Sequence, residues 1–434
     1  MFWNETKECM SRDEISAMQS ARLVKLVDRV YHNVPFYREK MQKIGLEPYD
    51  IRGIEDLEKL PFTTKQDLRD NYPFGLFAVP QSEIVRIHAS SGTTGKATVV
   101  GYTRRDLEIW SECVARAFTM AGVTKEDIVQ ICYGYGLFTG GLGAHYGAEK
   151  LGATVVPQST GNTKKLITMM KDFGVTAIAC TPSYLLHIAE TLEDEGLIND
   201  IHLKAAVCGA EPWTENMRKL IEEKLHVDAH DIYGLSEIMG PGVACDCHCH
   251  SGLHVFEDHF LPEIIDPETL NGVPEGTTGE LVFTTLTKEG LPLIRYRTRD
   301  LTSISYKQCE CGRTMARLSR FTGRSDDMLI IRGVNVFPSQ IEAALLELSE
   351  VKPHYLMIVD RENNLDTLEV QVEVDERFFS DEIRELENLT KKIAHAIQQM
   401  IKISRRLGLT QRHRQKNASK SMRTTNSAST STRT

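Results

Sequence analysis

The feature that most constrains this chain of 434 residues is an alternation of apolar runs and helical periods between residues 127 and 234. The apolar runs have the length of buried strands, and the segments between them repeat their apolar residues at helical spacing. Helix start signals, such as Ser183 after Pro182, precede these segments. Such alternation predicts a parallel sheet with helices on both faces. The expected strands are residues 128–132, 153–156, 175–180, 203–207 and 227–232.

Three further regions surround this alternation. A helical stretch from about residue 13 to residue 43 precedes it, and short alternating runs broken by Pro and Gly at residues 243–322 predict a β-rich subdomain. A capped helix and an alternating strand follow residue 323. We therefore predict an α/β fold. Residues 1–323 would form a large domain of parallel sheets flanked by helices, and residues 324–404 a small α+β domain on a hinge.

The last thirty residues, 405–434, have a different composition. They hold eight basic residues, no acidic residue and eleven Ser or Thr. Such a segment cannot bury enough apolar area to offset the cost of ordering its backbone, so we expect a disordered tail. Without the tail, the net charge of −9 would fall to −17.

The composition, 41% hydrophobic and 26% charged, is that of a globular protein rather than a disordered chain or a fibre. No run approaches the roughly 20 apolar residues of a membrane span. Residues 1–5 also lack the basic and then apolar pattern of a signal peptide. We expect a cytoplasmic protein with no membrane partner, whose ten cysteines are reduced.

The sharpest local motif is Ala-Ser-Ser-Gly-Thr-Thr-Gly-Lys-Ala at residues 89–97. Glycines and hydroxyl side chains let backbone N–H groups converge on an anion, and Lys96 adds a positive charge. The common nucleotide-binding loop needs Gly-x4-Gly-Lys-Ser/Thr, whereas Ser90 and Ala97 stand at two of those positions here. Strand-like segments flank the motif. It is therefore either a phosphate loop between two strands or a plain Gly/Ser hairpin turn.

Three later motifs, together with this loop, resemble those of the AMP-forming acyl-CoA synthetases, the adenylate-forming superfamily. They are Tyr-Gly-Leu-Ser-Glu at 233–237, Tyr-Arg-Thr-Arg-Asp at 296–300 and Gly-Arg-Ser-Asp-Asp at 323–327, in the family's order. Segments 133–141, 257–260 and 324–338 are similar to the phenylacetate–CoA ligases of that superfamily. The resemblance covers roughly residues 5–400. It implies that ATP activates an aryl carboxylic acid to an acyl-adenylate with release of pyrophosphate, and that coenzyme A then takes the acyl group.

The resemblance also implies roles for single residues. Catalytic roles fall on Lys96, Glu237 and Arg324, with Glu237 holding Mg²⁺. A carboxylate has two acceptor oxygens, so Asp300 would accept both ribose hydroxyls. Asp326 would be the hinge. The residues expected to bind ATP or AMP are Ser90, Ser91, Gly92, Thr93, Thr94, Ala210, Glu211, Pro212, Asp231, Ile232, Tyr233, Ser236, Asp300 and Arg324.

A pocket for the aryl acid is expected near the same motifs. Aromatic walls with glycines that leave room suit a flat ring on a short carboxylic acid. Ordinary core packing is the alternative interpretation of the same residues. The candidates are Tyr135, Phe138, Gly140, Gly141, Ala210, Ile238 and Pro241.

Cysteine and histidine residues gather in a second constellation. The run Cys-Asp-Cys-His-Cys-His at 245–250 is followed by His254 and by Cys-Glu-Cys-Gly at 309–312. Close thiols on two turns with imidazoles nearby meet the tetrahedral requirement of structural Zn²⁺. In a reducing compartment a metal is favoured over disulfides. Cys309 and Cys311 are the firmest ligands, while Cys247, Cys249 and His254 compete for the remaining positions.

A zinc-containing nucleic-acid-binding protein that uses the basic tail is the alternative function. A basic tail can bind phosphate backbones, but the body at −17 would repel them. We therefore favour the ligase, with an aryl acid, ATP and CoA as partners, no nucleic acid, and a homodimer as a possible assembly.

One family feature is missing from the C-terminal region. The family supplies an adenylation lysine there in a Ser/Thr-x-Gly-Lys context. Lys416 and Lys420 lie in the right stretch but lack that context. We therefore expect slow adenylation, because a charge that acts mainly in the transition state would be misplaced.

Overall fold

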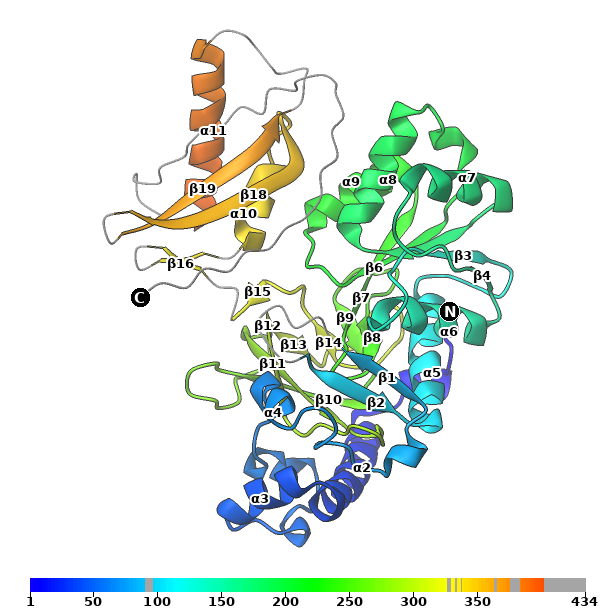
Figure 1. Cartoon of the computed structure of the whole chain (residues 1–434), viewed down its shortest axis with the longest axis vertical. Coiled ribbons are helices and arrows are strands. Elements are labelled where there is room, and N and C mark those ends of the chain that lie inside the picture. The colour runs from blue at the N-terminus through cyan, green and yellow to red at the C-terminus, as the bar shows by residue number, and fades with distance from the viewer. Residues whose placement is uncertain are drawn as a thin grey trace, which may run out of the picture.

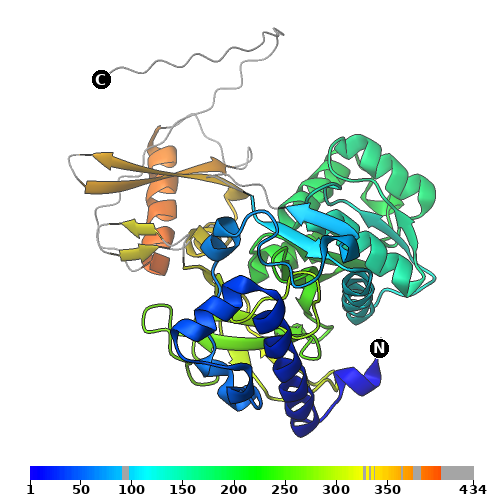
Figure 2. The same ribbon diagram turned by 60° about the horizontal axis from the view of Figure 1, so that its bottom comes forward.

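The computed structural model describes residues 1–89, 97–325, 329–331, 334–336, 338–362, 365–374 and 383–401. A large α/β body carries the first 325 residues, and a smaller α+β unit carries the C-terminal elements (Figures 1 and 2). The predicted fold class is therefore confirmed.

A nine-stranded sheet, in the order β13-β14-β9-β8-β7-β6-β5-β3-β4, forms the centre of the large body. Its second half is parallel, as the alternation of strands and helices predicts. The two strands in the middle of this half, β5 and β6, are apolar and wholly buried, because helices cover both of their faces. The parallel strands are β3 (Ile128–Ile131), β4 (Thr154–Val156), β5 (Ala177–Cys180), β6 (Ala205–Gly209) and β7 (Asp228–Leu235).

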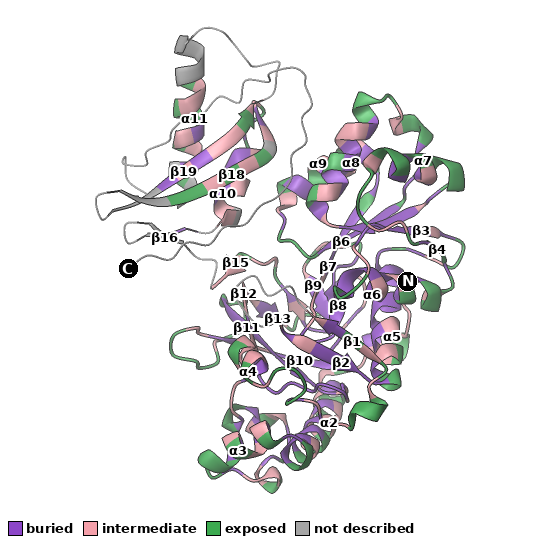
Figure 3. Ribbon diagram, viewed as in Figure 1, coloured by how far each residue is buried: buried purple, intermediate pink, exposed green. Residues whose placement is uncertain are grey.

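The helices divide between the two faces and build two cores. Leu166, Leu185 and Ile221 pack in one core, and Trp110 and Ala144 pack in the other. Figure 3 shows that the buried residues concentrate on the sheet between these layers. The covering helices are α5 (Arg104–Met120), α6 (Thr139–Leu151), α7 (Thr163–Phe173), α8 (Pro182–Asp194) and α9 (Glu215–Leu225).

The strands of the β-rich segment divide between two sheets. Four of them extend the central sheet in an antiparallel direction, because the chain reverses after β7 and pairs Ile232 with Cys245. They are β8 (Gly240–Cys245), β9 (Leu253–Val255), β13 (Ile304–Ser305) and β14 (Arg317–Leu318). A separate antiparallel sheet holds β10 (Phe260–Ile265), β11 (Gly279–Thr285), β12 (Tyr296–Thr302) and β15 (Gly323–Arg324).

The N-terminal region is helical, as its periodicity predicts. The expected stretch is interrupted at Pro35, which lacks an N–H and begins a new helix. The flanks of the glycine-rich motif are strands, as predicted, and they pair in an antiparallel direction. The elements are α1 (Glu5–Glu8), α2 (Arg12–Asn33), α3 (Pro35–Lys43), α4 (Lys65–Asp70), β1 (Arg86–Ala89) and β2 (Val99–Tyr102).

The C-terminal unit has its own core around Ile341, Leu345 and Ile397. An ion pair of 3.3 Å between His354 Nε2 and Glu190 Oε2 joins it to α8 of the large body. Its elements are β16 (Leu329–Ile331), β17 (Val334–Val336), α10 (Pro338–Leu346), β18 (Val351–Glu362), β19 (Leu365–Val374) and α11 (Ile383–Ile401). The expected hinge, Asp326, and the expected tail at 405–434 lie outside the described residues.

The described helices were also compared with the requirements of a membrane span. Within the described ranges, none of them is both long enough and apolar enough to cross a bilayer.

Candidate active site

The two ends of the glycine-rich loop are fixed in place. Ser90, Ser91, Gly92, Thr93, Thr94 and Lys96 lie outside the described residues. Before the loop, the backbone N–H of Ala89 donates to the carbonyl of Leu137 at 3.1 Å. After it, the hydroxyl of Thr98 donates to Oε1 of Glu237 at 3.4 Å. The loop therefore starts beside the 133–141 segment and ends beside the expected Mg²⁺ ligand.

Glu237 lies buried in the turn that follows β7. Lys65 Nζ, from α4, lies 3.5 Å from Glu237 Oε1. The buried Lys288 donates to the backbone carbonyls of Glu237 and Ile238 at 3.1 and 2.9 Å, and burial lowers the pKa of Lys288 to about 8. The sequence did not single out either lysine, because a lone lysine in a loop or short helix carries no pattern.

Three motifs that are distant in the sequence meet at Asp300. The Tyr233 hydroxyl donates to Asp300 Oδ2 at 2.5 Å, and Arg324 Nη1 donates to Asp300 Oδ1 at 3.1 Å. Asp300 and Arg324 are register partners on β12 and β15, and Tyr233 reaches them from β7. The ring of Phe321 stacks on Tyr233 at 4.3 Å between centroids. We call Tyr233, Asp300 and Arg324 the Asp300 cluster.

The carboxyl ends of β6 and β7 carry the other expected nucleotide residues. Ala210, Glu211 and Pro212 are exposed on the loop after β6, which is where open α/β sheets bind ligands. Ala210 has a left-handed φ of 72°, and Glu211 Oε2 accepts from the Ser183 hydroxyl at 2.6 Å.

The neighbouring strand β7 brings two further expected residues to the same edge. Asp231 pairs with Cys208, and Ile232 pairs with Gly209. Burial, together with the nearby Asp246 carboxylate, raises the pKa of Asp231 to about 7.

The structure brings two of the expected aryl-acid segments together. The start of α6 touches the turn after β7, where the hydroxyls of Thr139 and Ser236 lie 2.9 Å apart. Gly141 allows α6 to approach the segment after β3, since a Cβ there would lie 2.5 Å from the carbonyl oxygen of Gly134. Trp110 Nε1 donates to the carbonyl of Pro241 at 2.9 Å.

The members of the expected aryl-acid set differ in exposure. Ile238, Gly140 and Gly141 are buried, Tyr135 and Pro241 are half-buried, and Phe138 and Ala210 are exposed. The set therefore contains both buried residues and residues exposed at the surface of the molecule.

Comparison with known proteins agrees with this geometry. Residues 38–286 match the family model described as AMP-binding enzyme, and residues 333–426 match that of the AMP-binding enzyme C-terminal domain. The chain belongs to the AMP-binding enzyme family. The two matches fall on the large body and the C-terminal unit, and the second extends into the segment expected to be a tail.

Curated relatives give the same result over nearly the whole length. The chain is 51% identical to the phenylacetate-coenzyme A ligase of Thermus thermophilus over 412 residues, which cover 93% of each protein. It is also 51% identical to the Escherichia coli phenylacetate-coenzyme A ligase over 400 residues, or 92% of this chain and 91% of that one. The predicted class, an AMP-forming CoA ligase, is confirmed.

A family member with solved structures adds information on domain placement. A 2-hydroxyisobutyryl-CoA ligase in the postadenylation state is 29% identical and matches with a TM-score of 0.88, covering 94% of this chain and 88% of that one. The same ligase in the thioesterification state is 30% identical, covers 96% and 91%, and gives a TM-score of 0.72. The domain arrangement here therefore resembles the postadenylation state more closely.

The predicted cysteine and histidine constellation forms a compact group. The ligand atoms of Cys247, His254, Cys309 and Cys311 all lie within 4.8 Å of one another. Cys249 falls outside this four-residue group and is placed instead with Cys247 and His248. All ten cysteines are free thiols.

Proposed function

We propose that this AMP-forming CoA ligase acts on phenylacetate or a closely similar aryl acid. Two contacts carry the proposal, in a chain half identical to phenylacetate-coenzyme A ligases. They are the Asp300 cluster, whose Tyr233 lies on the strand that leads to Glu237, and the contact of Glu237 with Thr98 at the end of the glycine-rich loop. First, a carboxylate oxygen of the acid attacks the α-phosphorus of ATP, and pyrophosphate leaves. Then the thiol of CoA loses its proton, its sulfur attacks the carbonyl carbon, and AMP leaves with the bridging oxygen.

The residues of the chain supply positioning and charge rather than a nucleophile. The two oxygens of Asp300 would accept the ribose hydroxyls, and the guanidinium of Arg324 would stay beside the ribose and phosphate. Ser90, Ser91, Gly92, Thr93, Thr94 and Lys96 would hold the β- and γ-phosphates.

Glu237 is suited to a magnesium ion. It offers carboxylate oxygens next to the Thr98 hydroxyl at the end of the loop, and Mg²⁺ prefers oxygen ligands and few protein carboxylates. When bound, Mg²⁺ would neutralise charge on the phosphate oxygens. The ammonium group of Lys65, 3.5 Å from Glu237 Oε1, also faces this carboxylate.

The substrate class rests on the segment that begins α6 and on the relatives. Tyr135, Phe138, Gly140 and Gly141 would surround the ring, with Ile238, Pro241 and Ala210 completing the pocket. Ala210, Glu211, Pro212, Asp231, Ile232 and Ser236 would line the adenine side. Asp326 would be the hinge about which the C-terminal unit moves between the two steps.

We expect the protein to work in the cytoplasm. ATP and CoA are cytoplasmic metabolites, and ten free thiols fit a reducing cytoplasm. A homodimer remains part of the proposal. The predicted zinc ion would take no direct part in these steps, and the alternative of a nucleic-acid-binding protein has no support among the relatives.

A product assay tests the proposal. The chain is incubated with ATP, Mg²⁺, CoA and each of a dozen carboxylic acids, and pyrophosphate, AMP and thioester are measured separately. We expect all three products with phenylacetate, and pyrophosphate without thioester when CoA is omitted. Products from an aliphatic acid but not from phenylacetate would overturn the substrate class, and release of ADP would overturn the reaction.

A further inference from the structure

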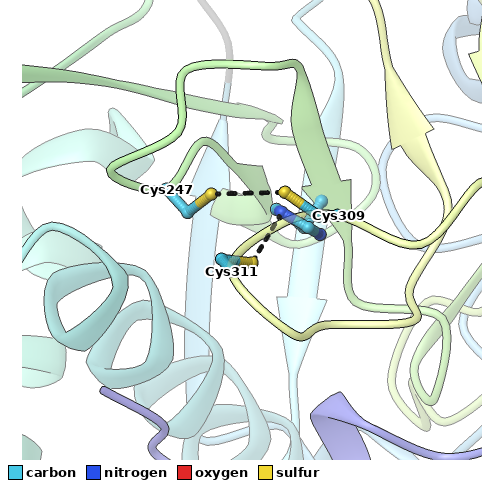
Figure 4. A group of neighbouring side chains, drawn as sticks. Cys247, Cys309 and Cys311 are labelled. Atoms are coloured by element: carbon cyan, nitrogen blue, oxygen red, sulfur yellow. Dashed lines mark hydrogen bonds between the residues drawn. The ribbon is translucent and has the colours of Figure 1, made fainter.

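We propose that the chain holds one structural Zn²⁺ ion, bound by Cys247, His254, Cys309 and Cys311, which clamps the far edge of the central sheet. The proposal is independent of the proposed function. Figure 4 shows the three sulfur atoms turned toward a common centre from two separate loops. Cys247, His254 and Cys309 are buried and Cys311 is half-buried, so the ion would be closed off, as structural zinc ions are.

The distances within the group are those of a tetrahedral zinc site. Zn–S bonds of about 2.3 Å and Zn–N bonds of about 2.0–2.1 Å, at tetrahedral angles, place two sulfurs about 3.8 Å apart and a sulfur and a nitrogen about 3.6 Å apart. Cys247 Sγ lies 3.8 Å from Cys309 Sγ. Cys311 Sγ lies 3.6 Å from His254 Nε2. Both separations match edges of that tetrahedron.

A disulfide does not explain this geometry. Two bonded sulfurs lie about 2.05 Å apart, far closer than Cys247 and Cys309. A disulfide would also not explain why the imidazole of His254 faces the sulfur of Cys311. The Ser251 hydroxyl lies 3.3 Å from Cys309 Sγ, where it can donate to a thiolate.

The backbone holds the four ligands in place. Cys247 follows β8, and His254 lies on β9, whose register partners are Cys245 on β8 and Arg317 on β14. Cys309 and Cys311 share a tight turn in which the N–H of Gly312 donates to the carbonyl of Cys309 at 2.9 Å, with a Gly312 φ of 92°. The site would therefore join the loop after β8 to the loop between β13 and β14.

The clamp would act on two neighbouring structures. On one side, Asp246 precedes Cys247, and its N–H donates to the carbonyl of Asp231 at 3.0 Å on the strand that carries Tyr233. On the other side, Arg313 Nε donates to Glu8 Oε2 at 2.7 Å, which anchors the N-terminal helix. Loss of the metal should loosen the N-terminal segment and the edge of the nucleotide strand while the parallel sheet persists.

Metal analysis of the full chain tests the proposal. The protein is purified under reducing conditions without chelators or metal-affinity steps, and its zinc content is measured by mass spectrometry. We expect about one zinc per chain in the unaltered protein and in Cys249→Ser, the matched control from the same loop. Cys247→Ser and Cys311→Ser should contain almost none. A chelator should lower the Tm without loss of far-UV circular dichroism from the sheet.

Several results would overturn the proposal. Unaltered protein without zinc would remove the site, and zinc retained in both ligand variants would place the ion elsewhere, for example at Asp228, His230 and His250. Zinc lost from Cys249→Ser but kept in Cys247→Ser would refute the ligand set. If the serine variants do not fold, Co²⁺ exchanged into the unaltered chain decides the matter. Tetrahedral, thiolate-bound absorption bands support the site, whereas an octahedral spectrum or no uptake rejects it.

Discussion

At the scale of single residues, the proposed nucleotide site depends on the carboxylate of Asp300. It accepts hydrogen bonds from Tyr233 and Arg324, so one side chain connects β7, β12 and β15. A bound ribose would compete for the same two oxygens, because they are the acceptors within the cluster. The charge and position of this carboxylate should therefore matter more for ATP affinity than for folding.

Replacing Asp300 tests that point. We expect Asp300→Ala to raise the Kd for ATP by about 100-fold or more, because two hydrogen bonds to a charged group, each worth about 1.5–3 kcal/mol, would be lost. Calorimetric titration with ATP measures the change, and circular dichroism checks that the chain is folded. Tyr233→Phe is the milder comparison, because it keeps the carboxylate. Unchanged affinity in a folded Asp300→Ala protein would refute the role of this residue.

A second prediction concerns the buried carboxyl of Asp231. Its pKa is raised to about 7 by burial, so the folded state binds its proton more tightly than the unfolded state does. Its contribution to stability is therefore lost as the pH rises from about 4 to about 7. Asp231→Asn should raise the Tm at pH 8 by a few degrees, because each kcal/mol added to the free energy of unfolding raises the Tm by roughly 2–4 °C. The increase in Tm should vanish near pH 4. An equal increase at both pH values would contradict a raised pKa at Asp231.

At the scale of elements, close packing of α6 fixes the segment expected to hold the aryl ring. Gly141 lies against the backbone of Gly134, and a hydroxyl contact joins Thr139 to Ser236. Because the opposing atom is a carbonyl oxygen of the backbone, it cannot move aside as the end of a side chain can. Gly141 is therefore needed for the packing whatever the substrate is.

Gly141→Ala tests this packing. The added methyl group would lie 2.5 Å from the Gly134 carbonyl, so we expect a loss of about 1–3 kcal/mol in stability and a higher KM for the aryl acid. Gly134→Ala is the matched control, since its Cβ would meet no atom within 4 Å. Thermal unfolding and steady-state kinetics give the two readouts. Equal behaviour of the two variants would show that the close approach is unimportant.

The sequence predicted those parts of the fold and site that local patterns carry. Apolar runs and helix start signals predict the parallel sheet. The motifs that resemble the family's predict that Tyr233, Asp300 and Arg324 belong to one site. The pairing of strands in the β-rich segment was less predictable. β8 turns back and pairs with β7 in the central sheet, and no local sequence pattern indicates which strand it joins. Lys65 and Lys288 were missed for a similar reason, since only the folded chain brings them to Glu237.

At the scale of the whole molecule, the proposed reaction would use two arrangements of the C-terminal unit, like the two states of the solved 2-hydroxyisobutyryl-CoA ligase. The present arrangement is closer to the postadenylation state of the solved relative, and the His354–Glu190 ion pair belongs to it. An exposed ion pair of this kind contributes at most about 1 kcal/mol, so it would not prevent movement to a second arrangement.

The C-terminal segment should limit the rate of adenylation. Lys416 and Lys420 lack the glycine-lysine context of the family, although the C-terminal family match runs to residue 426. We expect the chain to bind ATP and aryl acid yet adenylate slowly, and to pass a preformed acyl-adenylate to CoA at a normal rate. Stopped-time assays of each half-reaction measure this. Full adenylation that is unaffected by truncation after Arg405 would contradict it.

The proposed reaction begins with attack of a carboxylate on the α-phosphorus of ATP. Phenylacetate labelled with ¹⁸O in its carboxylate tests this directly, because the bridging oxygen of the acyl-adenylate stays with the phosphate when CoA displaces it. Mass spectrometry of the products should find ¹⁸O in AMP and none in pyrophosphate. Label in inorganic phosphate, or thioester formation with unlabelled AMP, would contradict the account.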